Sequence, residues 1–148
     1  MQTGNYEPKA SVQTIANAMD VGDPSNFARI WDLYGKDVDN IRSMVSGATV
    51  SDDVIRKTVA ECWKSNGYLL DPHGACGYRA LKDGLKPGET GLFCETAHPA
   101  KFKDTIESII GTPVEIPAKL AAFMKGEKKS VSLSADYEDF KRYLTSKI

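Results

Sequence analysis

Apolar residues recur at spacings of three and four along much of the chain, which is typical of helices with one buried face. Helix start and stop signals accompany this pattern: Ser51-Asp52-Asp53 precedes the longest apolar face, and Asn66-Gly67 follows it. The predicted helices are Asn26–Tyr34, Val38–Val45, the helix that carries the apolar face Val54–Trp63, His73–Lys82, Ala100–Ile110, Pro117–Lys125 and Asp136–Ser146.

Short apolar runs lie between several of these helices and predict strands at Ala48–Val50, Tyr68–Leu70 and Gly91–Cys94. Lys128–Ser134 is predicted as an edge strand or an extended segment. Alternating strands and helices with short connections indicate parallel βαβ units. The sequence therefore predicts an α/β fold with a partial parallel sheet and flanking helices. Three or four strands are few for an independent sheet, so we expect the chain to be part of a larger fold.

The composition is that of a globular protein, with 148 residues, 41% apolar residues, 26% charged residues and a formal net charge of −1. Basic and acidic residues number 19 and 20, which gives no electrostatic reason to expect binding to nucleic acid or to an anionic membrane. No apolar run approaches the roughly 20 residues of a membrane-spanning helix, and the first residues lack the pattern of a secretory signal. We therefore expect a cytoplasmic location.

Cys62, Cys76 and Cys94 are odd in number and widely spaced, which is unlike a disulfide framework. Together with His73 and His98 they offer zinc-binding side chains, but no CxxC or HxxxH spacing is present. We expect free thiols, mostly buried, and no metal site.

Three segments place polar residues where a predicted strand or loop meets a helix N-terminus: NAMDVGDPSNF, LDPHGACGYRAL and CETAHPAKF. Two of them share a layout in which a strand ends in polar residues, a proline follows, and a helix begins with small residues. Free backbone N–H groups and a partial positive charge at helix N-termini favour polar or anionic ligands there. The repetition on neighbouring strands predicts a common polar cleft.

Each candidate residue in this cleft also has a purely structural explanation. Thr96 and Asp71 are both possible helix caps, and His73 and His98 are both possible hydrogen-bonded structural histidines. The sequence contains no GxSxG, no Gly-rich phosphate loop and no HExxH, so local patterns alone assign no catalytic residue.

Taken together and in this order, TGNYEPKAS, NAMDVGDPSNF, GYLLDPHGACGYRALK and TAHPAKF resemble the C-terminal portion of the threonine synthase family. The resemblance covers nearly the whole chain and loosens after about Pro117. It implies a fold like that of the tryptophan synthase β subunit, pyridoxal 5'-phosphate (PLP) as cofactor, and a lyase that converts O-phosphohomoserine and water into threonine and phosphate. Residues 1–24 would be an irregular N-terminal segment, residues 25–116 the C-terminal part of the large PLP-binding domain, and residues 117–148 a C-terminal helical tail.

The resemblance implies cofactor contacts for Thr96, Asp71 and His73, with the Thr96 hydroxyl facing the pyridine nitrogen. Cys94-Glu95 departs from the small residues expected before this threonine. The family's Schiff-base lysine and phosphate-binding loop have no counterpart in this sequence. We therefore expect a fragment that is inactive alone, holds no PLP, and self-associates through surface that the rest of the enzyme would cover. The alternative is a non-catalytic small-molecule-binding or regulatory α/β module.

Overall fold

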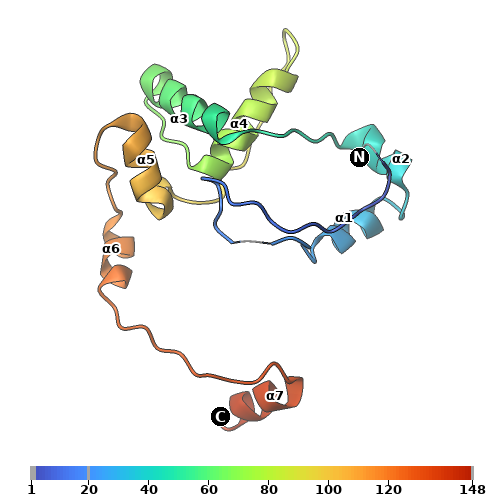
Figure 1. Cartoon of the computed structure of the whole chain (residues 1–148), viewed down its shortest axis with the longest axis vertical. Coiled ribbons are helices and arrows are strands. Elements are labelled where there is room, and N and C mark those ends of the chain that lie inside the picture. The colour runs from blue at the N-terminus through green and yellow to red at the C-terminus, as the bar shows by residue number, and fades with distance from the viewer. Residues whose placement is uncertain (1–2, 20, 148) are drawn as a thin grey trace. The chain divides into compact units, whose positions relative to one another are not determined.

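The computed structural model describes residues 3–19 and 21–147, and it divides into two units, Met1–Glu115 and Ile116–Ile148. Residues 1, 2 and 20 of the predicted N-terminal segment, and residue 148, lie outside the described residues. The described helices are α1 (Phe27–Leu33), α2 (Val38–Met44), α3 (Asp52–Asn66), α4 (Pro72–Gly84), the short 3₁₀ helix η1 (Pro99–Phe102), α5 (Lys103–Ile110), α6 (Ala118–Met124) and α7 (Tyr137–Thr145) (Figure 1).

The prediction of a parallel sheet is wrong, because no strand is formed anywhere in the described ranges. A strand needs a backbone partner, and the three predicted strands form no ladder with one another. Side-chain exposure nevertheless alternates from residue 91 to residue 98, with odd positions half-buried and even positions exposed. That period of two is the mark of an extended chain with one covered face. The apolar run predicted a buried strand, but only its odd positions are covered: Leu92 is 95% exposed and Cys94 is exposed.

The helices form close to their predicted positions, although Ser51 makes no side-chain cap hydrogen bond and α5 begins at Lys103 and not at Ala100. Side-chain caps fix several of the other ends. Asp37, Asp71 and Asp136 accept hydrogen bonds from backbone N–H groups in the first turns of α2, α4 and α7. Gly67 and Gly111 end α3 and α5 in the left-handed conformation, with φ of 65° and 70°. Each of these signals acts within a few residues, which is why it could be read from the sequence.

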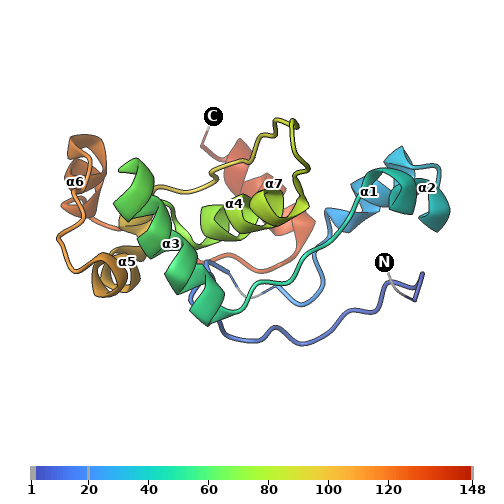
Figure 2. The ribbon, with the colours of Figure 1, turned by 90° about the horizontal axis from the view of Figure 1, so that it is seen from above.

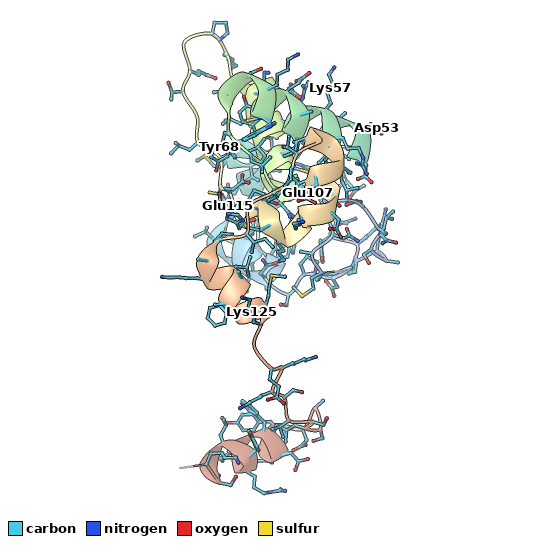
Figure 3. All side chains as sticks on the ribbon, turned by 90° about the vertical axis from the view of Figure 1, so that its left-hand side faces the viewer. Asp53, Lys57, Tyr68, Glu107, Glu115 and Lys125 are labelled. Atoms are coloured by element: carbon cyan, nitrogen blue, oxygen red, sulfur yellow. The ribbon has the colours of Figure 1, made fainter. Side chains whose placement is uncertain are left out.

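The core of the first unit is built around α3, which contacts both α4 and α5 (Figure 2). Asp53 and Lys57 lie on the exposed surface of α3 (Figure 3). The opposite face is apolar and packs with buried residues of the neighbouring segments. The core residues are Ile55, Val59, Cys62, Leu70, Ala75, Ile106 and Val114. Leu70 directly precedes Asp71 in the sequence, Ala75 follows in the first turns of α4, and both are core residues. The start of α4 is therefore fixed in the core.

The N-terminal segment is held by one contact within itself and by one contact with the start of α3. Gly22 has no side chain and can therefore lie against the backbone of Lys9. The Lys9 N–H donates a hydrogen bond to the Gly22 carbonyl oxygen at 3.4 Å. Further along, the Ile15 N–H donates to the Asp52 carboxylate at 3.3 Å, and Ile15 packs against the core. The first contact joins two parts of the N-terminal segment, and the second joins this segment to the start of α3.

The second unit contains α6 and α7 and has no buried residue in its described part. The predicted apolar stripe of α7, formed by Tyr137, Phe140 and Leu144, is exposed to 69%, 49% and 48%. The segment Lys128–Ser134 is not a strand. The assignment of residues 25–116 to a PLP-binding domain and of 117–148 to a tail stays a prediction. None of the helices that the structure describes is long and apolar enough to cross a membrane.

Candidate functional site

The start of α4 is organised by Asp71, which is fully buried. Its Oδ1 atom accepts a hydrogen bond from the His73 backbone N–H at 2.8 Å and lies 3.1 Å from Nδ1 of the His73 ring. Pro72 occupies the first helical position, where a missing N–H costs nothing. Asp71 is therefore a helix cap, as one of the two sequence explanations proposed, and it also orients an imidazole.

His73 is half-exposed, with 38% of its side chain accessible. A carboxylate oxygen can only accept, so Nδ1 carries the hydrogen in the contact with Asp71, and Nε2 is the remaining ring nitrogen. The ring also packs at a tilt against Phe102 of η1, with 5.3 Å between ring centroids. His73 is thus held from two sides while part of it stays accessible.

Glu95 contacts Asp71, the cap residue of α4. Its Oε1 atom accepts a hydrogen bond from the Asp71 backbone N–H at 2.7 Å. Its carboxyl group lies so close to Gly74 that any side chain at position 74 would overlap it. Burial raises the pKa of the Glu95 carboxyl; the hydrogen bond from the Asp71 N–H opposes this, and the neighbouring Asp71 carboxylate adds to the rise.

Thr96 lies next to Glu95 on the exposed side of the same segment. Its side chain makes no hydrogen bond within the described part of the chain. The cap of η1 is His98 instead, whose Nδ1 accepts from the Ala100 N–H at 3.1 Å. The structural explanation of Thr96 as a helix cap is therefore wrong, and its hydroxyl is available to a ligand.

The thiol of Cys76, on α4 one turn after Pro72, is half-buried near the same carboxylates. Burial raises its pKa, and the negative charges of Asp71 and Asp52 raise it further. A thiol that is held protonated is a poor nucleophile. Cys62 is buried, whereas Cys94 is exposed, contrary to the expectation that the thiols are mostly buried. Over residues 3–19 and 21–147, no group of three or more His, Cys, Asp or Glu side chains could hold a metal ion.

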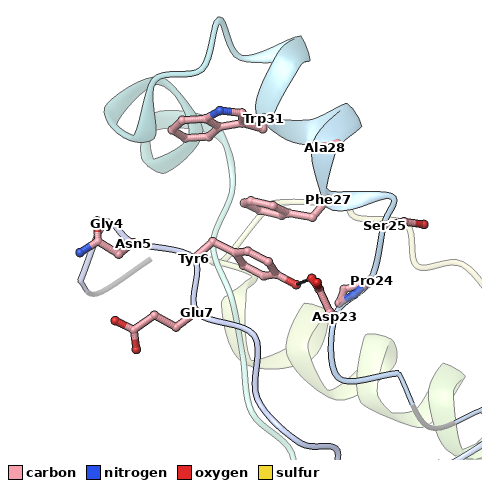
Figure 4. A pocket seen from close by; sticks show the side chains of 10 residues that line it. All are labelled: Gly4, Asn5, Tyr6, Glu7, Asp23, Pro24, Ser25, Phe27, Ala28 and Trp31. Atoms are coloured by element: carbon pink, nitrogen blue, oxygen red, sulfur yellow. Dashed lines mark hydrogen bonds between the residues drawn. The ribbon is translucent and has the colours of Figure 1, made fainter.

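A separate cavity of about 820 Å³ lies between the N-terminal segment and α1 (Figure 4). Tyr6 stacks on Phe27 with 4.3 Å between ring centroids, and its hydroxyl donates to Asp23 at 2.9 Å. Desolvation, then the hydrogen bond and charge of Asp23, raise the pKa of the Tyr6 hydroxyl. Thr96, Asp71 and His73 do not line this cavity.

The structure thus brings two of the predicted site residues into contact, Asp71 and His73, and places Thr96 next to Glu95, which touches Asp71. Their contacts with a cofactor stay a prediction. The sequence did not identify Glu95 or Gly74 as members of this site. The unusual glutamate before Thr96 and a glycine in the first turn of a helix were the two signals available.

Comparisons with known proteins agree with this architecture. A family model described as threonine synthase, C-terminal, matches residues 74–144. Threonine synthase from Escherichia coli (strain K12) is 38% identical over 144 residues, covering 97% of this chain and 33% of the relative. A mouse protein described as threonine synthase-like 2 is 28% identical over 146 residues, covering 81% of this chain and 30% of the relative.

Two solved structures are similar to the chain as a whole. The crystal structure of Escherichia coli threonine synthase matches with a TM-score of 0.78 and 37% identity, over 99% of this chain and 34% of that chain. The structure of PLP-bound threonine synthase from Brucella melitensis matches with a TM-score of 0.67 and 25% identity, over 98% of this chain and 36% of that chain. The chain spans about a third of the length of these relatives. By sequence and by fold, the chain is similar to the C-terminal part of threonine synthases.

Proposed function

We propose that this chain supplies the C-terminal part of a threonine synthase, a PLP-dependent lyase that converts O-phosphohomoserine and water into threonine and phosphate. The observation that carries the proposal is similarity along the whole chain. The relative from Escherichia coli matches 97% of it at 38% identity, and the solved structure of that enzyme covers 99% of it with a TM-score of 0.78.

The fit of the cofactor to this chain can be judged at Thr96. Its hydroxyl is exposed and has no hydrogen-bond partner among the described residues, while Glu95 and Ala97 on either side are half-buried. An exposed hydroxyl on a segment whose flanking residues are half-buried suits a contact with the ring nitrogen of PLP. When bound, PLP supplies an electron sink for reactions at the carbon atoms of an amino acid.

In this proposal Thr96 hydrogen-bonds the pyridine nitrogen and so orients the cofactor ring. A neutral hydroxyl offers no negative charge to hold a proton on that nitrogen, whereas a carboxylate would. Asp71 is fully buried, so its influence on a ligand passes through the His73 imidazole that it orients. His73 has the accessible surface to meet a ligand directly.

Substrate, self-association and a cytoplasmic location come from the same proposal and stay predictions. The substrate would be O-phosphohomoserine. Self-association would use apolar surface such as that of α7, where Tyr137 is 69% exposed.

The proposal can be tested by exchange into a working enzyme. This chain would replace the matched C-terminal third of Escherichia coli threonine synthase, and the chimera would be expressed in a strain that requires threonine for growth. We expect growth without threonine. The 148-residue chain alone, expressed in the same strain, should not restore growth. A chimera that is expressed and folded but supports no growth would contradict the proposal.

A further inference from the structure

Two carboxyl groups meet beneath the N-terminus of α4, and each has one oxygen atom without a partner. Asp71 uses Oδ1 for His73, and Glu95 uses Oε1 for the Asp71 backbone N–H. The other two oxygens, Asp71 Oδ2 and Glu95 Oε2, are buried and accept no hydrogen bond from any residue that the structure describes. Buried polar atoms in folded proteins nearly always have partners, so a pair of orphans at one place requires an explanation.

The explanation follows from what a carboxyl group can donate. An ionised carboxylate only accepts hydrogen bonds, so two ionised groups cannot satisfy each other's oxygens, and their charges repel. A protonated carboxyl group has one O–H donor. We propose that Asp71 and Glu95 share a single proton, carried by Glu95 and donated to Asp71, and that Glu95 is thereby the residue that positions Asp71 and His73.

The electrostatic environment acts in the same direction. Burial is the largest influence on the pKa of Glu95 and raises it; the Asp71 N–H favours the ionised form, and the neighbouring Asp71 carboxylate again raises the pKa. The other titratable groups close to this pair are His73, which contacts Asp71 Oδ1, and Cys76, whose thiol is affected by the charges of Asp71 and Asp52. Burial and Asp71 therefore work together to hold the proton.

The position of Glu95 depends on the absence of a side chain at position 74. A Cβ atom there would overlap both the carboxyl carbon and the carboxyl oxygens of Glu95. Gly74 thus opens a slot in the first turn of α4, and Glu95 fills it. Through this slot Glu95 reaches Asp71, Asp71 holds His73, and His73 extends to the accessible surface. The inference goes beyond the proposed function, because it concerns a proton held by this chain's own residues without any cofactor.

Titration of the Glu95 carboxyl by carbon-detected NMR in the full chain tests the proposal directly. The reference is a glutamate in an unstructured peptide with the sequence around Glu95. We expect Glu95 to titrate at a higher pH than the reference. In the Asp71→Asn variant its midpoint should fall but stay above the reference, because burial remains. A midpoint equal to the reference, or one that Asp71→Asn leaves unchanged, would overturn the proposal.

The pH dependence of stability provides a second measurement. A carboxyl group whose pKa is raised by folding contributes stability that is fully present below its unfolded pKa, about 4.5, and is lost as the pH rises through the folded pKa. Glu95→Gln keeps a donor for Asp71 Oδ2 at every pH and should remove this loss. Glu95→Ala has no donor or acceptor, and exchange of the Asp71 amide hydrogen should become roughly 5- to 150-fold faster.

A purely structural role for Glu95 would give a different result. Parent and Glu95→Gln would then lose stability identically over this pH range, and that outcome would refute the shared proton. Neither measurement uses PLP or O-phosphohomoserine. A failure here would therefore leave the proposed function standing, and a failure of the chimera would leave this inference standing.

Discussion

Replacing Gly74 with alanine should destabilise the chain, although alanine is the better helix former. The new methyl group would overlap the Glu95 carboxyl group and displace it from the Asp71 N–H, to which it is bonded at 2.7 Å. Leaving that buried N–H without its acceptor costs about 1–3 kcal/mol, while the Gly-to-Ala change in a helix contributes up to about 1 kcal/mol in the opposite direction. We expect a net loss of roughly 0–3 kcal/mol.

The sign of this effect should reverse when Glu95 is absent. In a Glu95→Ala background the methyl group meets no carboxyl group, and Gly74→Ala should stabilise the chain by up to about 1 kcal/mol. Urea unfolding of the four chains of this double-mutant cycle measures the coupling, which we expect to be about 1–3 kcal/mol. Gly84→Ala, in the same helix with open space around it, is the matched control and should behave alike in both backgrounds. Equal effects of Gly74→Ala in both backgrounds would refute the contact with Glu95.

Three further predictions concern other parts of the first unit. The Lys103 ammonium and the Val114 backbone N–H hold the pKa of the Glu107 carboxyl below its ordinary value. The stability that Glu107 contributes is therefore present above pH about 4.5 and is lost as the pH falls through the folded pKa. Glu107→Gln should flatten the acid side of a plot of melting temperature against pH. Ile106→Ala should cost about 2–5 kcal/mol in urea unfolding because Ile106 is fully buried, whereas Leu92→Ala, at a side chain that is 95% exposed, should change stability by less than about 0.5 kcal/mol. Thr96→Val in the Escherichia coli chimera should lower kcat roughly 5- to 150-fold, the range for one unpaired polar group of about 1–3 kcal/mol, and Thr96→Ser should be much milder; equal rates for the two variants would remove Thr96 from the cofactor contact.

The helices could be predicted because their signals are local. Asp37, Asp71 and Asp136 act on N–H groups two or three residues away, and Gly67 and Gly111 end helices by their own backbone conformation. The sheet could not be predicted in the same way, because a strand is defined by a partner that may lie anywhere in a protein. Around Phe93 the prediction of a buried strand was wrong in two respects, because the segment has no pairing partner among the described residues and Leu92 and Cys94 are exposed.

The candidate site also contains one contact between residues close in sequence and one between residues far apart. Asp71 and His73 are two residues apart, and their contact follows from a cap before Pro72. Glu95 lies 24 residues from Asp71, and no local pattern indicated that it would fit against Gly74. The sequence did offer one clue, since Glu95 stands where the family resemblance led us to expect a small residue. The structure shows that this residue occupies space left free by a glycine on another segment.

The most direct measurement of the central claim is phosphate release from O-phosphohomoserine by the purified chimera. In that protein this chain replaces the C-terminal third of Escherichia coli threonine synthase, the region that it matches at 38% identity. We expect PLP-dependent release of phosphate with threonine formed in equal amount, and none from the 148-residue chain alone. A chimera that is folded and binds PLP but releases no phosphate above the background without enzyme would contradict it.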